Sequence, residues 1–255
     1  MGRAMHQAGY DALGLAYLYV PFACEDLAAA VAGARAMAIR GLGISMPFKT
    51  EILPLLDAID PRAQRLGAVN TVVNDGGRLV GHNTDADGAL AALSEHGGAR
   101  GRRVLLVGAG GAARAIAFAL VDEGAHLTIV NRTDERGAAL AREVSAAHRP
   151  FADPGRDHDV FLNASSAGMT DVTAASPLDP ALLDAGKIAM DAVYKPVDTQ
   201  FLRAARARGA VTIDGSRMLL FQAMGQFTLY TGRAAPREAM EAALSAALAL
   251  DSPAR

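Results

Sequence analysis

Apolar residues occur along this chain in short continuous runs that alternate with alanine-rich helical segments. The clearest run covers residues 104–107 (VLLV), followed by glycine and alanine at 108–113 and by a helical pattern that Gly124 ends. A second apolar run follows at residues 127–130 (LTIV). Runs without alternating polar positions are typical of strands buried on both faces of a parallel sheet. The pattern therefore predicts an α/β protein with a parallel sheet.

The same alternation extends over the rest of the chain. Strands are expected over residues 16–20, 44–46, 67–73, 78–81, 160–162, 188–190 and 211–213. Helices are expected over residues 6–13, 24–39, 86–94, 138–147, 199–208, 215–231 and 237–250, with one more beginning at residue 48. The first of these elements predict a small α/β unit that precedes the larger parallel sheet.

Composition and charge narrow the class of protein. Hydrophobic residues make up 51% of the chain and charged residues 20%, which is too apolar for a disordered protein. The net charge is −2 and no basic run occurs, so we expect no nucleic-acid partner. No apolar stretch reaches the ~20 residues of a membrane span. Cys24 is the only cysteine and the six histidines lack ligand spacing, so we expect a cytoplasmic protein without disulfide or metal.

Residues 108–113 fit the glycine pattern G-x-G-x-x-A of Rossmann-type dinucleotide sites. Gly108 permits the tight turn, Gly110 lets a pyrophosphate approach the backbone, and Ala113 lets the helix pack close to the strand. The helix that follows directs its free N–H groups and its dipole at the phosphates. The expected phosphate-binding residues are Gly108, Ala109, Gly110, Gly111, Ala112 and Ala113.

The residues after the second strand decide between NAD and NADP. An NAD site usually places Asp or Glu there for the ribose hydroxyls, whereas an NADP site uses Arg for the 2′-phosphate. This chain has Asn131, Arg132 and Thr133, with Arg136 one helical step further. Because guanidinium groups bind phosphate in bidentate fashion, we expect NADP as the cofactor. The alternative is that Arg132 and Arg136 are solvated surface charges.

Other polar residues lie at the ends of predicted strands. Lys49 follows Pro47 at a strand-to-helix turn and is one of three lysines in a chain that otherwise uses arginine. On spacing alone, a solvated surface Lys is the simpler interpretation. Asp85 precedes a helix, where Asp is most often an N-cap, and Asn70 could bond its own backbone. Residues 163–169 (NASSAGM) follow a buried strand, at the sheet edge where ligands bind.

Taken together, these stretches resemble the shikimate dehydrogenase family over nearly the whole chain. The matching blocks are SMPFK (45–49), GAVNTVV (67–73), GHNTDADG (81–88), VGAGGAAR (107–114), NRT (131–133), NASSAGM (163–169), DAVYKP (191–196) and GSRMLLFQA (215–223). Because eight blocks occur in the family's order, the probability of a chance match is very small. The sequences SMPFK (45–49) and QFTLYTG (226–232) resemble the shikimate dehydrogenase-like branch of the family more closely than its other members.

The resemblance implies two α/β domains with a cleft between them. Residues 1–85, completed by C-terminal helices in 216–255, would bind substrate and catalyse, and residues 86–215 would form the NADP-binding Rossmann domain. The implied reaction is the reversible oxidation of shikimate to 3-dehydroshikimate by hydride transfer to nicotinamide. Lys49 and Asp85 match the family's catalytic pair. Because a hydroxyl group must lose its proton as its carbon releases hydride, such a pair suits the reaction.

The same matches imply the remaining site residues and the partner, which is a cyclic hydroxy acid similar to shikimate. The substrate-binding candidates are Ser45, Asn70, Tyr194 and Gln222. The cofactor-binding candidates beyond the glycine turn are Asn131, Arg132, Thr133, Arg136, Asn163, Ala164, Ser165, Met169, Val193 and Gly215. We expect no membrane partner, and a monomer or a homodimer.

One departure from the family pattern keeps alternatives open. Family members usually begin with a strand and a Ser-x-Ser loop that binds the substrate carboxylate, whereas this chain opens directly with GRAMHQ at residues 2–7. We expect either a start further upstream, a different way of binding the acid, or a different substrate such as quinate or aminoshikimate. A non-catalytic NADP-binding paralogue is the second class of function. A methyltransferase is the third, but it would want an acidic residue at the end of the second strand, where this chain has Asn131.

Overall fold

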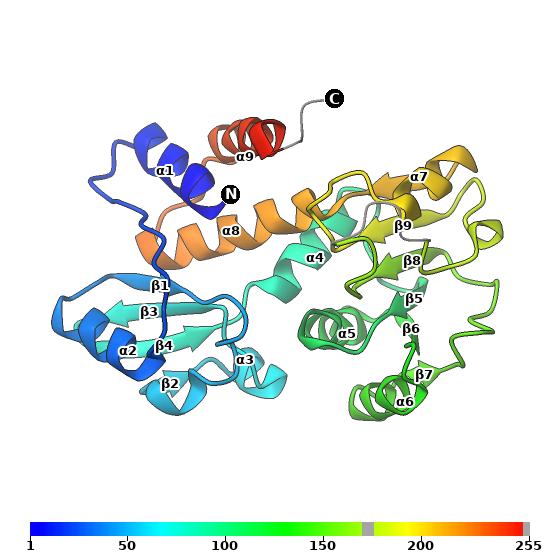
Figure 1. Cartoon of the computed structure of the whole chain (residues 1–255), viewed down its shortest axis with the longest axis horizontal. Helices are drawn as coiled ribbons and strands as arrows, with labels where there is room; N and C mark the ends of the chain where they lie inside the picture. Colours follow the sequence, from blue (N-terminus) through cyan, green and yellow to red (C-terminus); the bar gives the residue numbers. More distant parts are fainter. Residues whose placement is uncertain (170–175, 252–255) are drawn as a thin grey trace. The chain divides into compact units, whose positions relative to one another are not determined.

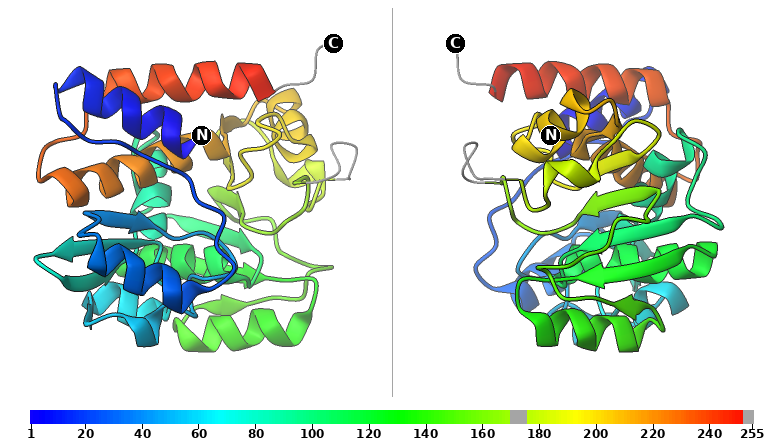
Figure 2. Two further views of the ribbon diagram at one scale, coloured as in Figure 1. Left: turned by 60° about the vertical axis from the view of Figure 1, so that its left-hand side comes forward. Right: turned by 90° about the vertical axis from the view of Figure 1, so that its right-hand side faces the viewer.

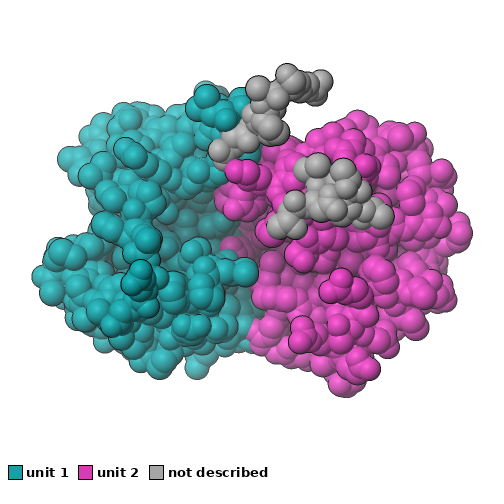
Figure 3. All heavy atoms as spheres, in the orientation of Figure 1, with its two compact units in different colours: residues 1–84, 222–255 teal, residues 85–221 magenta. Residues whose placement is uncertain are grey.

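The computed structural model describes residues 1–169 and 176–251. The chain forms two compact units, which are coloured separately in Figure 3. Unit 1 comprises Met1–Thr84 and Gln222–Arg255, and unit 2 comprises Asp85–Phe221. Each unit is an α/β structure with its own sheet.

In the part of the chain that the structure describes, unit 2 holds a six-stranded parallel sheet. Its strands are β5 (Arg103–Val107), β6 (His126–Val130), β7 (Ala147–His148), β8 (Val160–Asn163), β9 (Ile188–Asp191) and β10 (Val211–Ile213). They are arranged in the order β10-β9-β8-β5-β6-β7, and Figure 1 shows the part from β9 to β7. Numbered along unit 2, this is 3-2-1-4-5-6 when taken from the β7 edge, the strand order of a Rossmann fold. The predicted α/β class with a parallel sheet is confirmed.

Successive strand residues in unit 2 contribute to two separate cores, one on each face of the sheet. Leu106 and Ile129 belong to the core that includes α4 (Asp85–Ser94), α5 (Gly111–Glu123) and α6 (Asp134–Glu143). Leu105 and Phe161 belong to the core that includes α7 (Gln200–Ala207) and the 3₁₀ turn η2 (Pro180–Leu182). Both faces are covered, which is why the central strands carry continuous apolar runs such as residues 104–107.

Unit 1 contains a smaller mixed sheet of order β1-β3-β4-β2. Its elements are β1 (Gly41–Gly43), β2 (Ala58–Ile59), β3 (Thr71–Asp75), β4 (Arg78–His82), α1 (Gly2–Ala12), α2 (Leu27–Ala36), η1 (Leu53–Leu55), α3 (Pro61–Leu66) and α9 (Arg237–Asp251). Helix α8 (Gly215–Thr231) begins in unit 2 and continues into unit 1. The first and last helices, α1 and α9, pack side by side, as both views in Figure 2 show.

The strand that we expected over residues 16–20 is not formed. The segment hydrogen-bonds to a side chain of α1 instead of a neighbouring strand: Tyr19 N–H donates to Gln7 Oε1 at 3.4 Å, and Gln7 Nε2 donates to Tyr17 O at 3.5 Å. Its tyrosines provide the packing that its apolar pattern suggested, since Tyr19 stacks on His6 with ring centroids 4.7 Å apart. Leu18 remains 74% exposed.

Two other expectations for unit 1 were also wrong. The first strand is Gly41–Gly43 rather than residues 44–46, because the chain turns at Ser45, whose carbonyl accepts from Phe48 N–H at 3.0 Å. The helix expected from residue 48 is a run of turns that ends in η1, where Pro54 lacks the N–H needed to continue it. Helix α3 and strand β2 were missed.

Two kinds of feature are absent from the residues that the structure describes. Among the described residues, no helix is long and apolar enough to cross a membrane. Over the same ranges, no three His, Cys, Asp or Glu side chains come together in an arrangement that could hold a metal ion.

Candidate active site

The turn after β5 is shaped by Gly108, whose φ of +120° lies in the region that favours glycine. Its N–H donates to Val130 O at 2.9 Å. A Cβ at this position would lie 3.0 Å from the backbone carbon and oxygen of Ala164, in the loop that follows β8. The close approach of these two loops therefore requires glycine here.

The start of α5 has room for a ligand. Gly110 is the N-cap and lacks a side chain that could satisfy the first N–H groups of the helix. A Cβ at Gly110 or Gly111 would meet no atom within 4 Å, and Ala112 is exposed. Ala113, in contrast, is fully buried where α5 packs in the core. These features fit the diphosphate of a dinucleotide, which binds to free N–H groups at a helix N-terminus.

At the end of β6, the side chains turn outward. Asn131 Nδ2 donates to Thr133 O at 2.7 Å, which fixes the turn into α6. Arg132, Thr133 and Arg136 are exposed. Within residues 1–169 and 176–251, neither guanidinium group has an ion-pair or hydrogen-bond partner. Both are therefore available to a phosphate group, as an NADP site requires.

The carboxyl ends of β8 and β9 are joined by a buried group of side chains that we call the Asp191 cluster: Asn163, Asp191 and Thr199. Asn163 Nδ2 donates to Asp191 Oδ1 at 3.0 Å, and Thr199 Oγ1 donates to Asp191 Oδ2 at 2.7 Å. Asn163 Oδ1 also accepts from the Ser165 hydroxyl at 2.7 Å. Burial raises the pKa of Asp191 to about 6, because loss of solvation outweighs the hydrogen bonds that favour its charged form.

This pKa predicts a pH-dependent effect of Asp191→Asn on stability. A carboxyl whose pKa rises from 3.8 unfolded to about 6 folded makes wild-type stability fall as pH increases between those values, by about 3 kcal/mol. Asn cannot ionise, so the unfolding free energy of the variant relative to wild type should rise by most of that amount, about 2 kcal/mol, from pH 4 to pH 7. Urea denaturation at each pH measures it, with the exposed Asp198→Asn as control. A constant difference between variant and wild type would contradict the raised pKa.

Close backbone packing joins the loop after β9 to the start of α8. A Cβ at Gly215 would lie 2.5 Å from the Val193 carbonyl carbon and oxygen, and 2.7 Å from Tyr194 N. A larger residue at 215 would therefore displace this loop. Val193 is buried, whereas Tyr194 is 36% exposed and Met169 is 51% exposed. The cofactor candidates from β8, β9 and α8 thus lie in connected loops at one edge of the parallel sheet.

In unit 1, Asn70 is the centre of a buried hydrogen-bond group. Asn70 Nδ2 donates to Thr84 Oγ1 at 3.0 Å, and Thr84 N–H donates back to Asn70 Oδ1 at 2.9 Å. The Thr71 hydroxyl also donates to Asn70 Oδ1, at 2.7 Å. The Asn70 side chain thus holds the end of β4 to the start of β3, and it does more than bond its own backbone.

The two catalytic candidates come from segments that flank this group. Lys49 is half-buried, and its carbonyl accepts from Val69 N–H at 2.8 Å, which fixes its turn beside the residue that precedes Asn70. Asp85 directly follows Thr84 and is the first residue of α4, with 8% exposure. Ser45 is exposed, and its hydroxyl lies 3.5 Å from the Met46 carbonyl that it can donate to.

Gln226 is a residue that the sequence did not single out. Its Nε2 donates to Asn70 O at 3.1 Å and to Thr71 Oγ1 at 3.0 Å, and its Oε1 lies 3.4 Å from His6 Nε2. The candidate Gln222 is partly buried one helical turn earlier on α8. The spacing of four residues between two glutamines on one helix was the available signal, because such residues share a face.

His6 was also missed. It is fully buried, and burial lowers its pKa to about 4. It is therefore neutral near pH 7 and supports Gln226 without adding charge to unit 1.

The strand order, the glycine turn and the exposed arginines define unit 2 as a dinucleotide-binding domain of the Rossmann class. Three family models match successive parts of the chain: the shikimate dehydrogenase substrate binding domain at residues 2–72, shikimate / quinate 5-dehydrogenase at 90–172, and the shikimate 5′-dehydrogenase C-terminal domain at 215–244. The chain belongs to the shikimate dehydrogenase family, as its sequence blocks predicted.

Individual relatives agree with this assignment. The chain is 46% identical to the shikimate dehydrogenase (NADP(+)) of Natronomonas pharaonis, over 96% of this chain and 93% of that protein. It is similar to the crystal structure of shikimate 5-dehydrogenase from Thermus thermophilus in complex with NADP(H) and shikimate, with 39% identity, a TM-score of 0.89, and coverage of 96% and 94%. It is also similar to quinate dehydrogenase from Corynebacterium glutamicum in complex with NAD, with 33% identity, a TM-score of 0.88, and coverage of 96% and 94%.

Proposed function

We propose that this protein is an NADP-dependent oxidoreductase that reversibly oxidises shikimate to 3-dehydroshikimate, a step of aromatic amino acid biosynthesis. The observation that carries the proposal is the bonding at residues 69 and 70: the Asn70 side chain holds Thr84, the residue before Asp85, and the adjacent Val69 N–H donates to the Lys49 carbonyl. The relative from Natronomonas pharaonis is named for this activity, and the Thermus thermophilus structure contains both ligands.

The proposed reaction needs a proton acceptor at the substrate hydroxyl. The C3–H bond of shikimate breaks with its electron pair, the hydroxyl loses its proton, and a carbonyl forms. Bound NADP supplies the hydride acceptor. Lys49 and Asp85 form the proposed catalytic pair, with Asp85 orienting the Lys49 ammonium or amine group, and either residue receives the proton directly or through a water.

The proposed division of labour follows the two units. Residues 1–85, with the C-terminal helices within 216–255, bind substrate, and residues 86–215 bind NADP. The proposed substrate contacts are Ser45, Asn70, Tyr194 and Gln222, whose hydroxyl and amide groups match a polyhydroxylated ring. NADP is held by the glycine turn at its diphosphate and by Arg132 and Arg136 at its 2′-phosphate, because both guanidinium groups are exposed at the end of β6.

The proposal extends to the location of the protein in the cell and to its oligomeric state. We place the protein in the cytoplasm, since its one cysteine, Cys24, is free and allows no intrachain disulfide. We propose that it acts as a monomer or a homodimer on a small cyclic hydroxy acid.

A panel of substrates tests the identity of the acid. NADPH formation should be fastest, by kcat/KM, with shikimate, and at least tenfold slower with quinate or aminoshikimate. Faster turnover of quinate would identify a quinate dehydrogenase, the activity for which the Corynebacterium glutamicum relative is named. Binding of NADPH without turnover of any of the three acids would favour a non-catalytic paralogue.

A further inference from the structure

Asp191 is buried at the edge of the parallel sheet, yet it is not among the residues expected to touch either ligand. It is the last residue of β9, has no exposed surface, and pairs in register with Asn163, the last residue of β8. A carboxylate in such a place costs solvation free energy and persists only when hydrogen bonds compensate. Its partners therefore show what it is there to hold.

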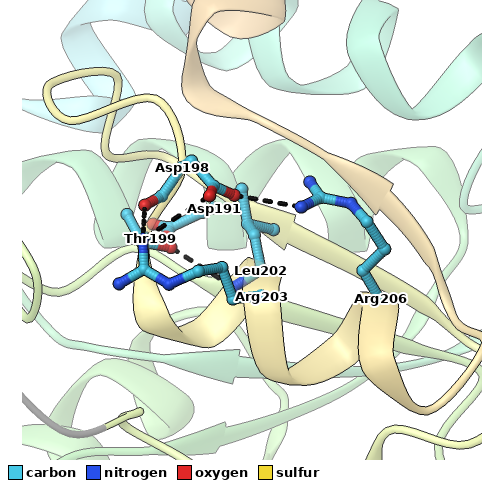
Figure 4. A network of polar contacts seen from close by, with 6 residues as sticks. All are labelled: Asp191, Asp198, Thr199, Leu202, Arg203 and Arg206. Carbon is cyan, nitrogen blue, oxygen red and sulfur yellow. Dashed lines mark hydrogen bonds and ion pairs between the residues drawn. The ribbon is translucent and has the colours of Figure 1, made fainter. Parts of the chain in front are cut away.

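Three donors from three segments converge on the Asp191 carboxylate. Asn163 Nδ2 and Val193 N–H both donate to Oδ1 at 3.0 Å. The Thr199 hydroxyl donates to Oδ2 at 2.7 Å and accepts from Leu202 N–H at 3.3 Å, so the same hydroxyl caps α7 (Figure 4). One carboxylate thus joins the loop after β8, the loop after β9 and the start of α7.

The bonds made by Asn163 extend this connection along the first loop. Its Oδ1 accepts from Ser165 N–H at 3.1 Å and from the Ser165 hydroxyl at 2.7 Å, and that hydroxyl accepts from Ala167 N–H at 3.2 Å. The backbone of Ala164 and Ser165 in turn lies against Gly108 in the glycine turn. Loss of the Asp191 carboxylate would therefore remove the acceptor that holds the Asn163 side chain, and with it the support of this loop.

The second loop is connected to α8 in a similar way. Val193, whose N–H is bonded to Asp191, lies within 2.5 Å of where a Cβ on Gly215 would be. The Val193 and Gly215 backbones therefore pack directly against each other, with no space for a side chain between them. Val193 thus connects the Asp191 carboxylate to the first turn of α8.

The position of these loops indicates which half of the cofactor they serve. A dinucleotide in a Rossmann fold spans the point where strand order reverses, which here lies between β5 and β8. Arg132 and Arg136 follow β6, on one side of that point, and therefore serve the adenosine half. The loops held by Asp191 follow β8 and β9, on the other side, where the nicotinamide half must lie.

We propose that Asp191 is a positioning residue that holds the loops after β8 and β9 in the arrangement that binds the nicotinamide half of NADP. This role rests on the proposed function, since it requires NADP in unit 2. It does not require contact between Asp191 and the cofactor. Removing the carboxylate leaves three donors without their acceptor, and the loops then rearrange to satisfy them.

Two cofactor probes distinguish positioning from general support of the fold. NADPH contains both halves, whereas 2′,5′-ADP contains only the adenosine, its 5′-phosphate and the 2′-phosphate. In Asp191→Ala, the Kd for NADPH, measured by fluorescence titration, should rise at least tenfold, and the Kd for 2′,5′-ADP, measured by calorimetry, should stay within twofold of wild type. In Asp191→Asn, which keeps one acceptor oxygen, the Kd for NADPH should rise about threefold.

Asp198→Asn provides a matched control. Asp198 precedes Thr199 but is exposed and pairs with Arg203 and Arg206 of α7 (Figure 4), so its removal should leave both Kd values unchanged. Equal weakening of NADPH and 2′,5′-ADP in Asp191→Ala and Asp191→Asn would overturn the proposal in favour of a role in fold stability. Unchanged NADPH binding in the two variants would overturn it as well. A wild-type protein that binds neither probe would refute the proposed function itself, and the positioning role with it.

Discussion

Replacing Lys49 with methionine should lower kcat for shikimate oxidation about 1,000-fold, within the 10²- to 10⁴-fold range typical of general acid–base groups. Methionine keeps most of the length of the side chain but cannot exchange a proton or hydrogen-bond to the substrate hydroxyl as a donor. Steady-state NADPH formation at saturating shikimate and NADP measures the effect. The Kd for NADPH should remain within twofold, because Lys49 belongs to unit 1 and the glycine turn to unit 2.

Lys187→Met is the matched control for this variant. Lys187 precedes β9 at the amino end of the parallel sheet and donates to the His158 carbonyl, so it lies at the opposite end of the strand from the loops that would hold NADP. Its replacement should leave kcat within twofold. If Lys49→Met retained more than a tenth of wild-type kcat, the proposed proton transfer at Lys49 would be wrong.

The second large effect is expected when Arg132 and Arg136 are both replaced with leucine. Charge-assisted hydrogen bonds contribute about 1.5–3 kcal/mol each, so kcat/KM for NADP should fall about 100-fold or more. NAD lacks the 2′-phosphate, so kcat/KM for NAD should change less than threefold. Steady-state rates with each dinucleotide at fixed shikimate measure this change in preference.

Arg142→Leu serves as the control for charge alone. Arg142 is also exposed on α6 but lies six residues, or about 9 Å along the helix, beyond Arg136. It should leave the preference for NADP unchanged. If the double variant retained the wild-type preference, the two arginines would be ordinary surface charges and the 2′-phosphate would be bound elsewhere.

The parallel sheet could be predicted from the sequence because its signals are local. Each central strand is a short apolar run, and the glycine turn, helix and second strand follow within 30 residues. The nucleotide half of the candidate site depends on the same local order. In unit 1 the periodic signals were weaker, because helix α3 has only six residues. The residues at its boundaries, Asp60 and Pro61 at the start and Gly67 at the end, were the available signal.

Long-range contacts account for what the sequence could not supply. Residues 16–20 have the composition of a strand, but a strand needs a partner, and the segment bonds to Gln7 instead. Gln226 contacts Asn70 across 156 residues of sequence, and nothing in its neighbourhood distinguishes it from Gln222. Asp191 belongs to a recognisable block, but its role depends on donors 28 residues before it and eight residues after it.

The most direct test of the proposed reaction follows one hydrogen atom. Shikimate that carries deuterium at C3 is incubated with NADP and the protein, and the products are analysed by mass spectrometry. The proposed mechanism predicts one deuterium in each NADPH formed, and one 3-dehydroshikimate for each NADPH. Deuterium that remains in the acid or is lost to water, or failure to form NADPH at all, would contradict hydride transfer from shikimate as the function of this protein.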